Sequence, residues 1–61
     1  MNEYDVKRLA LVLAIQAEIE AMKVENIIRE RQDYSPAYDE PAFIEMAERL
    51  RHVAYCHNEQ L

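Results

Sequence analysis

Residues 32–43 read Gln-Asp-Tyr-Ser-Pro-Ala-Tyr-Asp-Glu-Pro-Ala-Phe, and they contain the main break in the helical pattern of the chain. It holds both prolines of the chain, Pro36 and Pro41, while glycine is absent from all 61 residues. Proline and glycine are the residues that interrupt helices most strongly. Because both strong interruptions lie in this one place, the sequence predicts two helices joined by a single connection.

The segment before the break predicts a long first helix over about residues 3–32. It is rich in Ala, Leu, Glu, Lys, Arg and Met, which all favour the helical state. Asn2 is placed to cap the first turn, and Glu3 and Asp5 put negative charge where the helix dipole favours it. At 1.5 Å per residue we expect a helix about 45 Å long.

The segment after the break predicts a second helix over about residues 40–57, following a loop over about 33–38. Pro36 disfavours the helical conformation at Ser35, and Asp39 is a typical capping residue. Pro41 falls in the first turn, where a proline costs no hydrogen bond. A short connection makes two helices antiparallel neighbours. The predicted fold class is therefore all-α, a two-helix hairpin forming one domain over residues 1–61.

Apolar side chains follow different patterns on the two predicted helices. The second helix, about 27 Å long, has a single apolar face, made by Phe43, Met46, Ala47, Leu50, Val53 and Ala54. The first has two apolar sectors: Leu11, Val12, Ile15, Ile19 and Met22 form one, and Val6, Leu9, Leu13, Val24, Ile27 and Ile28 form the other. We expect the shorter helix to cover the first helix only over about residues 14–32, leaving Leu9, Leu11, Val12 and Leu13 exposed.

An exposed apolar segment of this kind usually marks an interface, and two-fold pairing of identical chains is the commonest way to cover it. A chain of 61 residues is also near the lower limit for a stable monomer without disulfides or metals. We therefore predict a homodimer with four helices, whose interface contains Val6, Leu9, Leu11, Val12, Leu13 and Ile15. The alternative is a structural subunit that pairs with a different protein in a hetero-oligomeric complex.

Charge and composition restrict the other partners. Twelve acidic and seven basic residues give a net charge of −5, which disfavours binding to nucleic acid or to an anionic membrane. The longest apolar run, residues 9–15, is too short to span a bilayer, and we expect no export signal. The single cysteine, Cys56, suits a reducing compartment. We expect a cytoplasmic protein.

His52, Cys56 and His57 form the one cluster of metal-ligand or nucleophile type in the sequence. His52 and Cys56 stand four residues apart and share a helix face, but no second ligand pair completes a zinc site. A thiol nucleophile needs an oxyanion hole and a pocket, which a hairpin without a glycine loop does not offer. We therefore predict no metal, no cofactor and no catalytic residue, and keep a metal-dependent or thiol enzyme as the weaker alternative.

Tyr34 and Tyr38 flank Pro36 in the predicted loop. Tyrosines at such a position can anchor a partner protein at low entropic cost. They can equally close the open end of the helix pair, because a small core needs every large side chain that it can bury. Both readings stay open, and the two tyrosines form a candidate partner-binding loop.

Three stretches, residues 20–26 (EAMKVEN), 35–43 (SPAYDEPAF) and 47–55 (AERLRHVAY), resemble the small helical proteins of the exo-xis early region of lambdoid phages. The resemblance implies a helical, self-associating protein made early in infection or on prophage induction. Such a protein would promote lytic development by acting on a host or phage protein in the bacterial cytoplasm. The family has no catalytic motif, so the resemblance assigns no residue a role.

Overall fold

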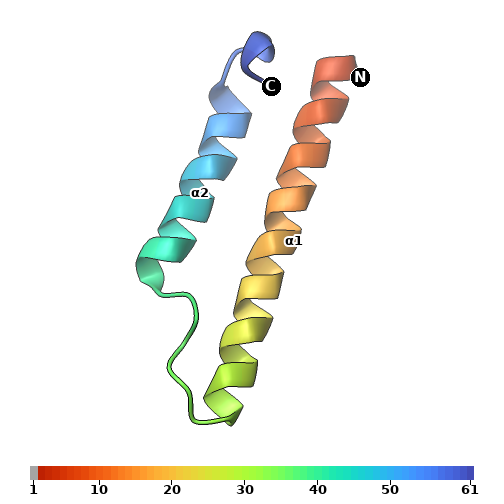
Figure 1. Cartoon of the computed structure of the whole chain (residues 1–61). Coiled ribbons are helices and arrows are strands. Elements are labelled where there is room, and N and C mark those ends of the chain that lie inside the picture. The colour runs from red at the N-terminus through yellow and green to blue at the C-terminus, as the bar shows by residue number, and fades with distance from the viewer. Residues whose placement is uncertain (1) are drawn as a thin grey trace.

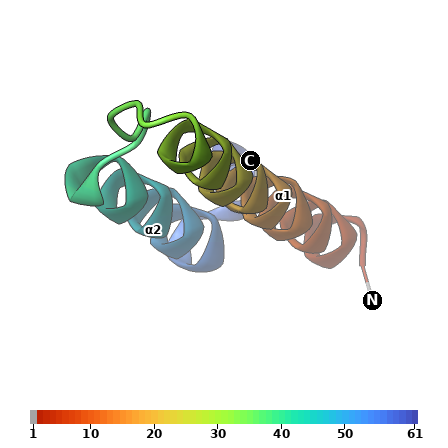
Figure 2. The ribbon, with the colours of Figure 1, turned by 90° about the horizontal axis from the view of Figure 1, so that it is seen from below.

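The chain forms an all-α hairpin (Figure 1). In the computed structural model, which describes residues 2–61, helix α1 spans Glu3–Arg31, helix α2 spans Glu40–Tyr55 and a 3-10 turn, η1, spans Asn58–Gln60. The two long helices run antiparallel and lie side by side in one layer (Figure 2), and the molecule measures 47 × 19 × 11 Å. The prediction of a hairpin with a long first and a shorter second helix is confirmed.

Both helices begin at the capping residues that the sequence predicts. The Asn2 side chain accepts a hydrogen bond from the backbone N–H of Asp5 at 2.9 Å. The Asp39 carboxylate accepts one from the backbone N–H of Ala42 at 3.2 Å, and Pro41 lies in the first turn of α2. Each cap satisfies an N–H group that the helix itself leaves without a partner.

Helix α1 ends at Arg31, one residue earlier than predicted. The chain leaves the helix through a left-handed turn at Asp33. Asp33 has a φ angle of 60°, and the N–H of Tyr34 donates to the carbonyl oxygen of Arg29 at 2.8 Å. The N–H of Asp33 donates to the carbonyl oxygen of Glu30 at 3.1 Å. This pair of bonds is the Schellman motif, in which glycine usually takes the left-handed position. Aspartate fills it here because it tolerates that conformation better than most residues.

The connection then runs back along the last turns of α1 instead of turning sharply. Arg29 Nε donates to the carbonyl oxygen of Ser35 at 2.8 Å. The Asn26 side-chain amide bonds both backbone groups of Tyr38, donating at 2.9 Å and accepting at 3.0 Å. Residues 32–39 therefore run back past the last turns of α1 before the second helix starts. As a result, α2 begins beside the middle of α1 and not beside its end (Figure 1).

As a consequence, α2 covers a part of α1 that is shifted toward the N-terminus from the part that we expected. Its start is fixed at Asn26 through Tyr38, and its end is fixed at Arg8, whose guanidinium contacts the Val53 carbonyl oxygen. The expected cover of residues 14–32 is therefore wrong at both limits, because the cover runs from about Arg8 to about Asn26. A tight turn would have placed α2 beside the end of α1, and the bonds from Arg29 and Asn26 replace that turn by a longer path.

The core between the helices is small. Among the described residues only Met22 of α1 and Met46 and Val53 of α2 are buried, at 8%, 6% and 7% exposure. A ring of half-buried side chains surrounds these three, from both helices. Three buried side chains are few for a folded domain, and several large apolar side chains are more than one-third exposed.

Candidate interaction surfaces

The largest exposed apolar surface lies on α1. Six of its large apolar side chains are 44% to 56% exposed, and we call them the outer stripe: Val6, Leu9, Leu13, Val24, Ile27 and Ile28. Single exposed apolar residues are ordinary, but six on one face of a helix, in a group at each end, are of the kind found at interfaces. The outer stripe coincides with the second apolar sector predicted from the sequence.

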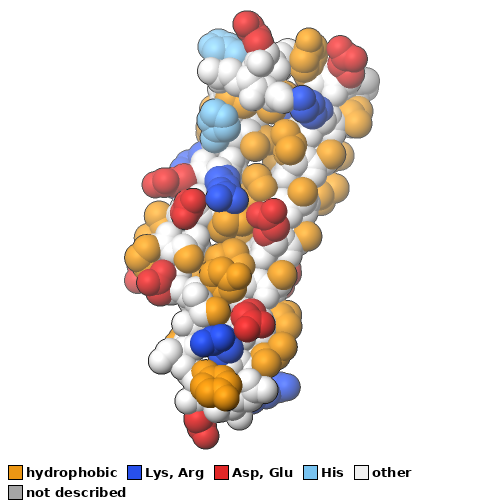
Figure 3. Space-filling model, viewed as in Figure 1, with side chains coloured by type: hydrophobic (Ala, Val, Ile, Leu, Met, Phe, Trp, Pro, Cys, Tyr) orange, Lys and Arg blue, Asp and Glu red, His pale blue; other side chains and the backbone are white. Residues whose placement is uncertain are grey.

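The outer stripe faces away from α2. Advancing 100° per residue places its six side chains within an arc of about 100°, centred nearly opposite Met22. Met22 is the buried residue of α1 in the core between the helices. Figure 3 shows apolar side chains along the margin of the molecule that α1 forms, away from α2. Helix α1 therefore has one apolar face covered by α2 and a second that the hairpin leaves uncovered.

The six residues predicted for the interface divide between these two faces. Val6, Leu9 and Leu13 belong to the outer stripe, with exposures of 54%, 48% and 56%. Leu11, Val12 and Ile15 are half-buried, because α2 lies along this part of α1. Leu11 and Ile15 line a groove together with Val53 of α2, so we assign them to the contact between the helices.

The accessible surface of the chain is larger than its mass requires. The hairpin exposes 4922 Å². A compact monomer of 7.2 kDa exposes about 4,100 Å² by the usual scaling of surface with mass. The excess of about 800 Å² reflects the elongated shape of the hairpin, and it is of the same order as the area that each partner buries in a protein–protein interface of standard size.

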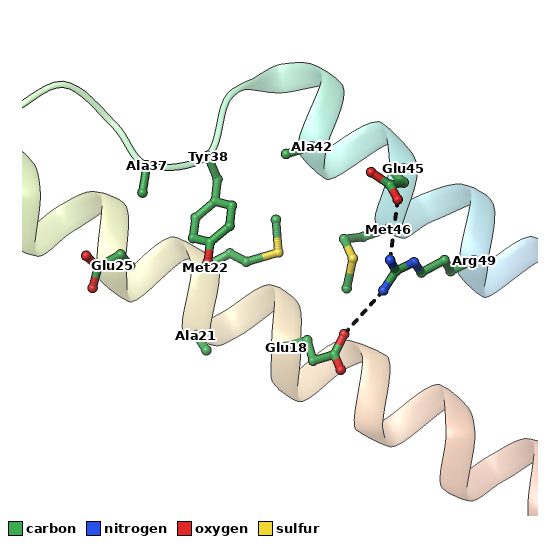
Figure 4. A pocket seen from close by; sticks show the side chains of 10 residues that line it. All are labelled: Glu18, Ala21, Met22, Glu25, Ala37, Tyr38, Ala42, Glu45, Met46 and Arg49. Atoms are coloured by element: carbon green, nitrogen blue, oxygen red, sulfur yellow. Dashed lines mark hydrogen bonds and ion pairs between the residues drawn. The ribbon is translucent and has the colours of Figure 1, made fainter.

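A groove of about 670 Å³ opens between the helices near the connection (Figure 4). Its apolar lining comes from Ala21 and Met22 of α1, Ala37 and Tyr38 of the connection, and Ala42 and Met46 of α2. Three carboxylates also line it, those of Glu18, Glu25 and Glu45. Arg49 lies between two of them, 3.8 Å from Glu18 and 3.3 Å from Glu45, and so joins α2 to α1. The groove is apolar at its floor and acidic at its rim.

The two loop tyrosines lie in different environments. The Tyr38 ring lines this groove and points toward Met22, with 38% of the residue exposed (Figure 4). Tyr34 is 61% exposed, and the Arg29 guanidinium lies over its ring, 5.7 Å from the centroid. A cation at this distance from an aromatic face is attracted to it. Tyr38 thus packs within the hairpin, whereas Tyr34 remains accessible to a partner.

Arg8 holds the C-terminal segment onto α1, a role that the sequence reasoning missed. Its guanidinium donates to the carbonyl oxygens of Val53 and Cys56, the second at 2.6 Å, and to Asn58 Oδ1 at 2.8 Å. Lys7, its neighbour, donates to the carbonyl oxygen of Leu61. A cation at the C-terminus of a helix satisfies carbonyl groups and complements the dipole. The sequence signal for this role was an arginine next to an apolar run. That signal does not identify the partner of Arg8 unless the position of α2 is known.

The cluster of His52, Cys56 and His57 does not come together as one site. Helix α2 ends at Tyr55, two residues before the predicted end, so Cys56 and His57 lie in the segment after it. Cys56 is half-buried with Sγ 3.7 Å from the Arg8 guanidinium, while His52 lines the groove formed with Leu11 and Val53. Across residues 2–61, no group of three or more His, Cys, Asp and Glu side chains is placed to hold a metal ion.

Comparison with protein-family models, with curated proteins and with solved structures finds no match to this chain. None of the helices within residues 2–61 has the length and apolar character needed to cross a membrane.

Proposed function

We propose that the protein is a non-enzymatic helical adaptor or regulator that pairs with a second copy and binds another protein. The observation that carries the proposal is the outer stripe, six exposed apolar side chains on the face of α1 opposite α2. Covering it would remove apolar surface from water, which is the main driving force of protein association. The three buried side chains of the monomer supply little of that driving force themselves.

The surface area supports the pairing. Each copy has an excess of about 800 Å² over a compact monomer, which is the area that a standard interface removes per partner. Of the six residues predicted for the interface, the proposed interface keeps Val6, Leu9 and Leu13. It also includes Val24, Ile27 and Ile28, further along α1. Leu11, Val12 and Ile15 support it from within the hairpin.

The second partner is a host or phage protein with a basic surface. The net charge of −5 favours such a partner and speeds the encounter through long-range attraction. The surfaces that self-pairing leaves free are the acidic outer faces of the helices and the connection with Tyr34. The resemblance to the exo-xis early proteins supports the further proposal that this binding occurs early in phage development, in the bacterial cytoplasm, and promotes the lytic programme.

Sedimentation equilibrium from micromolar to near-millimolar concentration tests the self-pairing. We expect the mass of two chains, with a melting temperature that rises with protein concentration because pairing stabilises the folded state. A folded monomer at every concentration would contradict the proposal and favour a subunit of a hetero-oligomeric complex. Capture of a partner by the tagged chain in phage-infected cells should lose efficiency as salt is raised, since the attraction is electrostatic.

A further inference from the structure

The outer stripe has the spacing of a seam between two long helices. Val6, Ala10, Leu13, Ala17, Glu20, Val24 and Ile27 follow one another in alternating steps of four and three residues. This is the heptad pattern that places one side of a helix along a neighbouring helix over its whole length. All seven positions lie within α1, and except for Glu20 they are apolar.

We propose that two copies of the chain pair through this seam in antiparallel orientation, which rests on the self-pairing proposed above. The two α1 helices then form the centre of a row of four helices, and each α2 lies on the outside. The orientation follows from the charged residues of the seam and not from its apolar residues, which would fit either direction.

A parallel pair brings like charges together. Glu20 and Arg31 fall in the same arc of α1 as the outer stripe, and both are exposed. In a parallel two-fold pair every residue of the seam faces its own copy, so Glu20 would face Glu20 and Arg31 would face Arg31. Like charges that face one another across a helix seam are unfavourable and direct the choice of partner and orientation.

An antiparallel pair removes both conflicts. Arg31, at the end of one α1, then lies beside the first turn of the other, which carries Glu3 and Asp5. The two helix dipoles also oppose each other, so that each positive end lies beside a negative end. Near the middle of the seam the side chain of Ala17 is small, which lets the two helices approach closely there.

Distances between spin labels distinguish the two orientations. We would label Asp5→Cys, Gln16→Cys and Glu30→Cys, each in a Cys56→Ser background. All three positions are exposed and lie outside the six residues of the outer stripe. In an antiparallel pair, labels at position 5 or at position 30 should be roughly 35 Å apart, and labels at position 16 less than about 20 Å apart. A mixture of the position 5 and position 30 variants should show a short distance that neither variant shows alone.

The circular dichroism and sedimentation of each labelled variant establish that it is folded and paired before its distances are used. In a parallel pair the labels would be close together at all three positions, and the mixture of the position 5 and position 30 variants would show no new short distance. That result would overturn the proposal while leaving self-pairing intact. A long distance at position 16 in a dimer would place the interface elsewhere and overturn it as well. Absence of any dimer would overturn the proposed self-pairing itself.

Discussion

Replacing Leu13 by glutamate tests the outer stripe most directly. Leu13 is 56% exposed in the hairpin, the highest value in the stripe. The substitution should therefore leave α1 intact, because glutamate favours helix about as well as leucine and the side chain is not needed in the core. Any loss of self-pairing can then be attributed to the interface and not to the fold of the single chain.

The size of the effect can be worked out from the exposure of Leu13. Full burial of a leucine side chain contributes about 2 kcal/mol, and roughly half of that is still available to a partner. Removing a carboxylate from water into an apolar seam costs about 2 kcal/mol more. The loss is therefore about 3 kcal/mol per chain and about 6 kcal/mol per pair. A change of this size raises the dissociation constant about ten-thousand-fold.

The assay is sedimentation equilibrium, with Ile44→Glu as the matched control. Ile44 is 48% exposed on α2, so it undergoes the same change of charge at similar exposure, but outside the outer stripe. We expect the Leu13 variant to be monomeric, with a melting temperature independent of protein concentration, and the Ile44 variant to pair like wild type. If Leu13→Glu pairs with unchanged affinity, or if both variants lose pairing equally, the reasoning from the outer stripe is refuted.

Three further predictions concern the contacts within the hairpin. Arg8→Gln should lower the free energy of unfolding by about 2 kcal/mol, measured by urea titration, because charged hydrogen bonds to the end of α2 are lost, while Arg51→Gln should change it little. Asn26→Ala should cost about 1 to 2 kcal/mol, since both backbone groups of Tyr38 lose their partner; unchanged stability would mean that these bonds do not fix the connection. Asp33→Gly should raise the melting temperature, by a stabilisation of about 0.5 to 1 kcal/mol, because glycine relieves the left-handed conformation; a lower melting temperature would contradict this account.

The parts of the fold that depend on local sequence could be predicted closely. The two caps, at Asn2 and Asp39, and the break around Pro36 depend on residues within one turn of the feature that they control. The starts of both helices agree with the structure for this reason. The ends are less sharply encoded, because a chain without glycine has no strong stop signal, and α2 ends two residues early at Tyr55.

The placement of α2 could not be predicted, because it depends on contacts between residues far apart in the sequence. Arg8 and Val53 are 45 positions apart, and nothing near either one indicates the other. The connection also has a local ambiguity. Residues 32–39 can form a tight turn or an extended path, and the bonds from Asn26 to Tyr38 decide for the path. With this path Leu11 and Ile15, predicted for the interface between two chains, lie in the contact with α2 instead.

The same placement gives α1 an unusual position for a helix in so small a chain. It has α2 on one face and an uncovered apolar face opposite. On our proposal, pairing buries the second face of α1 and completes a core that the monomer only begins with Met22, Met46 and Val53. Pairing then adds to the stability of a hairpin that is already folded, so the melting temperature of the wild type rises with the concentration of the chain, whereas that of the Leu13→Glu variant does not.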